Sequence, residues 1–195
     1  MESRIIISFF ILLATSILSC ANNDYSPKPN GYFRIPFPEK EYVQTTIGCP
    51  YEFSIPTYAK VTDFVNADKE EPCWKNIQFP QFNATLHISY FNFQNKITLE
   101  QLSEDARIFA FKHTSKATSI DQENIRIPNE NKFGIAYQIG GNTASNYQFY
   151  LTDSTKHFIR GALYFNEKPN LDSIQPVLDF IKTDINQLII SLKWK

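Results

Sequence analysis

Hydrophobic and polar residues alternate with a period of two in several stretches of the second half of the chain. Such alternation is typical of strands that have one buried and one polar face. Turn-forming residues at 140–142 and 153–156 separate three of these stretches, which predicts a meander of three strands. The predicted strands are residues 84–90, a short one at 125–127, and the meander strands 133–139, 147–151 and 157–165.

Two segments have the longer period of amphipathic helices. In the first, Thr98 and Gln101 have the spacing of a capping box, and the helix is predicted to end near Lys116. Its apolar stripe comprises Leu99, Leu102, Ala106, Phe109, Ala110 and His113. The second helix is predicted from about Ser173 to Lys193, with Pro176 in its first turn, where proline is tolerated. Its stripe comprises Ile174, Val177, Leu178, Ile181, Ile185, Leu188, Ile189 and Leu192.

This order of a strand, a helix, three strands and a helix predicts an α+β sandwich with a largely antiparallel sheet and flanking helices. The order resembles that of the PsbP/Mog1-like modules, which implies a fold but no function. Prolines recur throughout residues 31–81, and proline breaks helices and central strands. We therefore predict that this third of the chain is irregular structure wrapped over the core, with one short strand at 51–55.

The first 19 residues have the features of a bacterial lipoprotein signal peptide. A basic start precedes an apolar run from Ile5 to Leu18, and Ile17-Leu18-Ser19 leads into Cys20 like a lipobox. An ordinary signal peptide and a transmembrane helix are the alternatives, although the run of 14 residues is shorter than the roughly 20 that a span needs. We expect a signal peptide at 1–19, a lipidated Cys20 with a proline-stiffened tether at 20–31, and one domain at 32–195.

Two cysteines, Cys49 and Cys73, remain once Cys20 is assigned to the lipid. An even pair in an exported chain predicts a disulfide. Two buried thiols and a metal pair are the alternatives, but a metal site needs further ligands at short spacing, and the neighbouring sequence has none. The predicted disulfide would staple the proline-rich third of the chain.

Composition adds few candidates for chemistry. The formal net charge of −1 gives no basic excess for nucleic acid, and the aromatic content of 15% predicts sheet packing, with a binding face as the alternative. The histidines His87, His113 and His157 lack the spacing of a metal site, which favours structural roles. Residues 153–157 contain Asp, Ser and His, but Asp and Ser are ordinary turn residues. We predict no catalytic residue, no metal site and no cofactor.

Several short stretches share the order and spacing of one family: residues 27–35, 49–53, 56–59, 73–77 and 86–90. Together with the lipobox and the aromatic meander, they resemble the gliding-motility lipoprotein GldD family of the Bacteroidota. The resemblance implies a lipid-anchored accessory protein that supports gliding and type IX secretion through contacts with other envelope proteins, without enzymatic activity. Residues 21–24 lack the charged run that accompanies surface export, so we expect the domain to face the periplasm from either membrane.

The resemblance also implies O-glycosylation, because Bacteroidota modify Asp-Ser/Thr sequences that are followed by an apolar residue or Thr. Ser154 and Ser173 both match this motif, although Ser173 is also placed to cap the second helix. An alternative function is a periplasmic module that binds a lipid, glycan or peptide in a pocket between sheet and helix. A hydrolase is a third option, and the missing nucleophile and metal patterns count against it.

Overall fold

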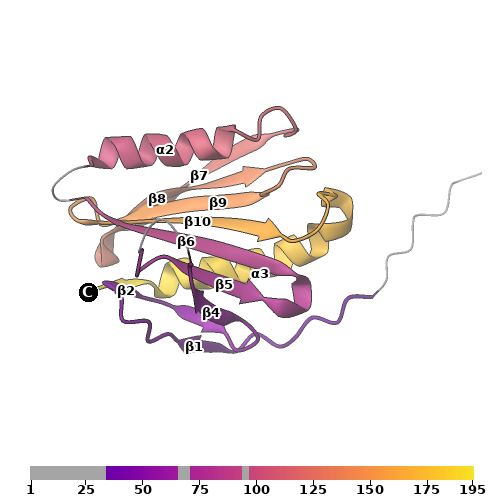
Figure 1. Cartoon of the computed structure of the whole chain (residues 1–195), viewed down its shortest axis with the longest axis horizontal. Helices are drawn as coiled ribbons and strands as arrows, with labels where there is room; N and C mark the ends of the chain where they lie inside the picture. The colour runs from indigo at the N-terminus through magenta and orange to yellow at the C-terminus, as the bar shows by residue number, and fades with distance from the viewer. Residues whose placement is uncertain (1–33, 66–70, 94–96) are drawn as a thin grey trace, which may run out of the picture. The chain divides into compact units, whose positions relative to one another are not determined.

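A seven-stranded antiparallel sheet organises the compact unit formed by residues 35–195 (Figure 1). The computed structural model describes residues 34–65, 71–93 and 97–195. The strand order is β4-β5-β6-β10-β9-β8-β7, and every neighbouring pair is antiparallel. The strands are β4 (Lys60–Asp63), β5 (Lys75–Phe79), β6 (Ala84–Asn92), β7 (Ile120–Ile127), β8 (Lys132–Ile139), β9 (Tyr147–Thr152) and β10 (His157–Phe165).

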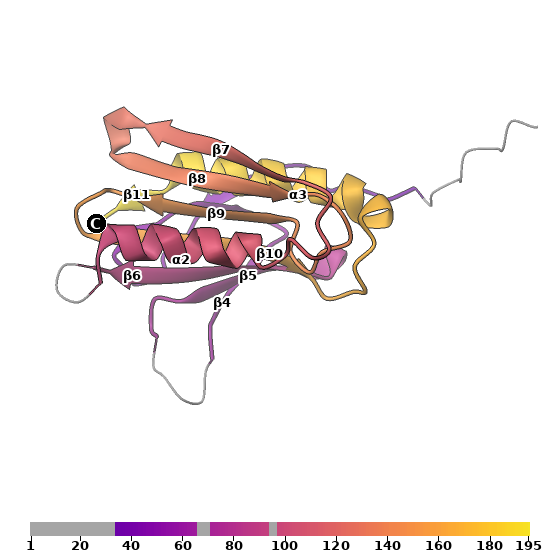
Figure 2. The same cartoon turned by 90° about the horizontal axis from the view of Figure 1, so that it is seen from above.

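The two helices lie on opposite faces of this sheet (Figure 2). Helix α3 (Leu171–Ser191) covers the main core, where Ile181 and Ile185 are fully buried. Helix α2 (Leu99–Phe111) packs over β9 and β10 on the other face, where Leu102 and Ala106 meet Phe158. Alternate residues of the central strands therefore enter different cores. The predicted α+β class with a largely antiparallel sheet and flanking helices is confirmed.

The capping box predicted for α2 is present. The Gln101 backbone N–H donates to Thr98 Oγ1 at 3.2 Å, and the Thr98 N–H donates to Gln101 Oε1 at 2.9 Å. The predicted stripe is wrong at Phe109, which is 40% exposed, and at His113, which lies beyond the helix end. The helix rests on only part of the sheet, so Phe109 lies at its margin, where its ring contacts Arg160.

Helix α3 begins two residues before its predicted start. The Leu171 backbone N–H donates to Asn142 Oδ1 at 2.7 Å, and the N-cap residue is Asn170. Ser173 is therefore an exposed residue inside the helix rather than its cap, and Pro176 lies in the second turn rather than the first. Among the described residues, no helix is long and apolar enough to cross a membrane.

The proline-rich third of the chain is more regular than predicted, because it supplies β4 and β5 of the main sheet. The predicted strand at 51–55 is two strands, β2 (Tyr51–Glu52) and β3 (Ser54–Pro56), which pair with different partners. Strand β3 pairs with β1 (Tyr42–Gln44), whereas β2 pairs with β11 (Lys193–Trp194), directly after α3. Two 3-10 turns, η1 (Pro80–Phe82) and η2 (Pro128–Glu130), lead into β6 and β8.

Candidate functional site

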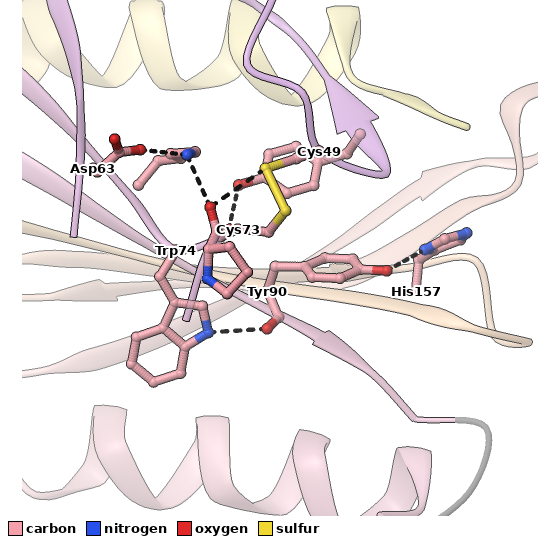
Figure 3. Close-up of a disulfide and its surroundings, with 9 residues drawn as sticks. Cys49, Asp63, Cys73, Trp74, Tyr90 and His157 are labelled. Carbon is pink, nitrogen blue, oxygen red and sulfur yellow. Dashed lines mark hydrogen bonds and ion pairs between the residues drawn. A yellow bond between two sulfur atoms is a disulfide. The ribbon is translucent and has the colours of Figure 1, made fainter. Parts of the chain in front are cut away.

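A disulfide within the proline-rich segment joins Cys49 to Cys73, two residues before β5. Cys49 and Cys73 are bonded, with their Cα atoms 5.5 Å apart. The buried Tyr51 hydroxyl donates to the Cys73 carbonyl at 2.7 Å, and burial raises the pKa of this phenol. Figure 3 shows the disulfide on the side of the sheet that faces α3 and the indole of Trp74 on the side of α2. The bond thus fixes the backbone from which Trp74 projects.

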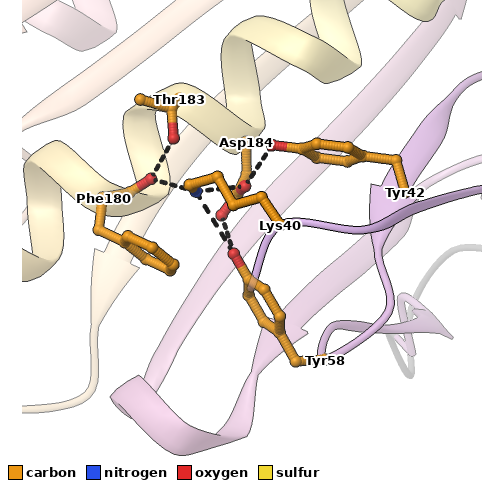
Figure 4. Close-up of polar contacts among 6 residues, drawn as sticks. All are labelled: Lys40, Tyr42, Tyr58, Phe180, Thr183 and Asp184. Carbon is orange, nitrogen blue, oxygen red and sulfur yellow. Dashed lines mark hydrogen bonds and ion pairs between the residues drawn. The ribbon is translucent and has the colours of Figure 1, made fainter. Parts of the chain in front are cut away.

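A buried carboxylate in α3 fastens the same segment (Figure 4). Asp184 is 2% exposed and accepts hydrogen bonds from Lys40 Nζ at 2.6 Å, Tyr42 Oη at 2.8 Å and Tyr58 Oη at 2.5 Å. Lys40 also donates to the Phe180 carbonyl at 2.9 Å. Burial, followed by the hydrogen bond to Asp184, raises the pKa of both tyrosines, so both remain donors at neutral pH.

A buried lysine closes the other end of α3. Lys132 is fully buried, and its Nζ donates to the carbonyls of Ile189 and Leu192 at 3.0 Å each and to that of Ile190. These are carbonyls of the last helical turn and just beyond, which lack partners within the helix. A cation is favourable there because it also faces the negative end of the helix dipole. Glu130, at 2.6 Å, balances the charge.

Sequence reasoning missed both ionic sites, although each left a signal. Asp184 follows Ile181 by three residues and precedes Leu188 by four, so it lies on the predicted apolar face of the helix. Lys132 comes directly before the predicted strand 133–139, in phase with its inward-facing Ala136. A charged residue in the phase of the core indicates a buried ion pair.

Each of the three histidines has a side-chain hydrogen-bond partner. His87 Nδ1 lies 2.6 Å from Asn76 Oδ1, and the other two contact Gln148 and Tyr90, respectively. Burial lowers the pKa of all three imidazoles, which favours their neutral forms. Within the described ranges, no three metal-ligating side chains are grouped so that they could hold an ion.

The Asp-Ser-Thr-Lys-His stretch forms a tight turn instead of a triad. Asp153 Oδ1 accepts the backbone N–H groups of Thr155, Lys156 and His157, and Ser154 has a positive φ of 64°. Burial raises the pKa of Asp153, but these hydrogen bonds lower it to about 2. In the part of the chain that the structure describes, no hydrogen bond joins Ser154 to His157, whose ring lies against Trp194. Ser154 and Ser173 are both exposed, whereas Cys20 lies outside the described residues.

A groove of about 400 Å³ runs between β7 and α3. Strand β7 forms one edge of the sheet, so its outer backbone groups pair with no strand of the described chain. Asp121 and Glu123 line one part of the groove, and Ile125 and Ile190 line another, with Ile190 56% exposed. The groove can receive an extended chain with apolar and basic side chains.

The protein is thus an α+β domain whose N-terminal segment contains a disulfide and whose surface has a groove beside β7. Comparison with known families then identifies it: the chain belongs to the gliding motility lipoprotein GldD family, whose model matches residues 22–194. The family predicted from the sequence is confirmed, and membership gives the chain a role in gliding motility and an anchor in the cell envelope.

The chain was also compared with curated protein sequences and with solved structures. No curated protein with a similar sequence was found. The solution structure of cyanobacterial PsbP (CyanoP) from Synechocystis is similar, with 12% identity, a TM-score of 0.47, and coverage of 81% of this chain and 95% of that chain.

Proposed function

We propose that this protein is a lipid-anchored accessory component of the cell envelope, required for gliding motility and for the associated type IX secretion machinery, and that it acts through protein–protein contacts without catalysis. The observation that carries the proposal is the family match across residues 22–194. In the proposal, Cys20 carries the lipid after removal of residues 1–19, residues 20–31 tether the domain, and the domain faces the periplasm.

The groove beside β7 is the contact surface that we assign to this function. An extended segment of a partner envelope protein would pair with the free edge of β7 and place an apolar side chain on Ile125 and Ile190. A basic residue of the same segment would meet Asp121 and Glu123, which gives the contact a preferred register.

The test uses matched variants on the chromosome of a gliding host. Deletion of the gene should abolish spreading and lower adhesin export. Ile190→Asp, in the groove, should reproduce both defects, whereas Ile108→Asp, on the outer face of α2, should behave as wild type. Both isoleucines are exposed helix residues, so the two changes carry similar folding costs. Protein levels measured by immunoblot serve as the control.

Two outcomes would contradict the proposal at different levels. Normal spreading and export in the deletion strain would refute the role in the machinery. Loss of both in the deletion strain, but not in Ile190→Asp, would show that the partner binds another surface. The alternative function, binding of a small ligand, is supported by a separate pocket on the other face of the sheet.

A further inference from the structure

A second pocket, of about 320 Å³, lies beside α2 on the same face of the sheet. Strands β6 and β10 form its floor, and its lining includes Phe64, Trp74, His87, Arg160 and Tyr164. Its volume is at the lower end of the roughly 300–1,000 Å³ typical of small-molecule sites. Aromatic rings and one guanidinium therefore meet in a space suited to a small ligand.

Arg160 is the unusual residue of this pocket. Its half-buried guanidinium forms no hydrogen bond and no ion pair with any described residue. Its carbon Cζ lies 4.1 Å from the centroid of the Phe109 ring, which holds the cation in place and supplies no acceptor. The two buried lysines, Lys75 and Lys132, are both neutralised by carboxylates. Arg160 thus keeps its N–H donors available.

The surroundings of Arg160 determine how strongly its charge is stabilised. Burial lowers the pKa of Arg160, while Tyr164 and Asp105 raise it from a distance. Asp105 is exposed on α2 and interacts with Arg160 without forming an ion pair. A half-buried cation of this kind is stabilised when an anion replaces the water that it lost.

The aromatic walls of the pocket are fixed in place. Trp74 Nε1 donates to the Tyr90 carbonyl at 2.9 Å, and the Trp74 and Phe64 ring centroids are 5.4 Å apart. Tyr164, on β10, packs edge-on against His87, with ring centroids 5.5 Å apart. Because these contacts already order the side chains of the walls, those side chains lose less conformational entropy when a ligand binds.

We propose that this pocket binds a small organic monocarboxylate, with the carboxylate on the Arg160 guanidinium and the ligand's ring between Trp74 and Tyr164. An arginine fork matches a carboxylate with two parallel hydrogen bonds. Arg160 is the only permanent cation among the described residues of the lining, so a single negative charge balances it, whereas a phosphate dianion would leave excess charge. The ring can belong to an aromatic acid or to a sugar acid.

The experiment titrates the purified, isotopically labelled protein with phenylacetate and, separately, with glucuronate. NMR follows the indole N–H of Trp74 and the Nε–H of Arg160. We expect saturable shifts at both signals with at least one acid, with a Kd between about 0.1 and 10 mM, as suits a ligand of this size. The neutral analogues phenylacetamide and glucose should bind at least about tenfold more weakly.

Variants test the assignment to Arg160. Arg160→Gln should weaken binding of the acid at least about tenfold, whereas Arg107→Gln, an exposed arginine paired with Glu104 on α2, should leave it unchanged. Asp105→Asn removes a competing negative charge and should tighten binding slightly. Amide spectra of each variant establish that it is folded, and Tyr164→Ala provides a second route to loss of binding if Arg160→Gln unfolds.

The outcomes separate the sources and decide the proposal. Binding of phenylacetate alone identifies an aromatic acid, and binding of glucuronate alone identifies a sugar acid. The proposal is refuted by the absence of saturable shifts up to about 20 mM of both acids, by equal affinity for acid and neutral analogue, or by tighter binding of inorganic phosphate. None of these results bears on the β7 groove, so this inference and the proposed function fail independently.

Discussion

Lys132 has the most deeply buried cation of the described chain, and replacing it with methionine tests how the end of α3 is held. Methionine keeps the apolar stem of the side chain and removes the ammonium group, which leaves the carbonyls of Ile189, Ile190 and Leu192 without their donor. Removing one partner from a buried charged network costs about 3–5 kcal/mol, because the remaining polar groups stay desolvated. Lys132→Met should therefore lower the free energy of unfolding by about that amount.

Urea denaturation, followed by far-ultraviolet circular dichroism, measures this change. With a urea m-value of about 2 kcal/mol per molar, the midpoint should fall by about 2 M. Trp194 provides a local signal, because its Nε1 donates to the Asn131 carbonyl at 3.2 Å, beside Lys132 in the sequence. Its fluorescence should change before the global transition if the last turn of α3 loosens first.

Glu130→Gln is the matched control for this variant. The Glu130 side chain is 51% exposed, so solvent screens its contact with Lys132 and the midpoint should fall by less than in Lys132→Met. A Lys132→Met protein within about 1 kcal/mol of wild type would refute the reasoning, because the three carbonyls would then find other partners or need none.

Three further changes test the Asp184 cluster, the disulfide and the Asp153 turn by the same denaturation assay. Asp184→Ala should cost about 2–4 kcal/mol, whereas the exposed Asp179→Ala should cost far less; similar losses would contradict the role of the buried cluster. Replacing both Cys49 and Cys73 with serine should cost on the order of 3 kcal/mol, given their separation of 24 residues, and a neutral result would show that the link adds no stability. Asp153→Ala should lower the free energy of unfolding by about 1 kcal/mol at pH 7. The folded pKa of about 2 lies below the ordinary 3.8, so the stability difference from wild type should shrink as the pH falls from 3.8 to about 2. A difference that stays constant with pH would contradict this assignment.

The sequence predicted those strands and helices whose hydrophobic pattern is regular along their length and whose partners are close in sequence. Strands β9 and β10 bury alternate residues against α3, and short turns connect β8, β9 and β10, so pattern and topology agree. The capping box of α2 is likewise a local signal, and its hydrogen bonds form as expected. The sequence could not reveal how far α2 extends across the sheet, which is why Phe109 was assigned to the core.

The proline-rich third escaped prediction because its partners are distant in sequence. Strand β5 alternates over only five residues, with Ile77 and Phe79 directed inward, and it is recognisable as a strand only beside β6. The β2–β11 pair joins residues near 51 to the end of the chain, so neither strand is stable without the other. The role of Asp184 could not be predicted for the same reason, because its three hydrogen-bond donors come from this distant segment.

The segment from residue 35 onward is therefore held against the sheet and α3 by three different kinds of link. The β1–β3 and β2–β11 pairs provide backbone hydrogen bonds, Asp184 provides buried ionic contacts, and the disulfide provides a covalent bond to β5. Two of these links end on or next to α3, the helix that also forms one wall of the β7 groove. A covalent bond and a buried ion cluster hold this segment firmly, because neither yields by fraying from an exposed end.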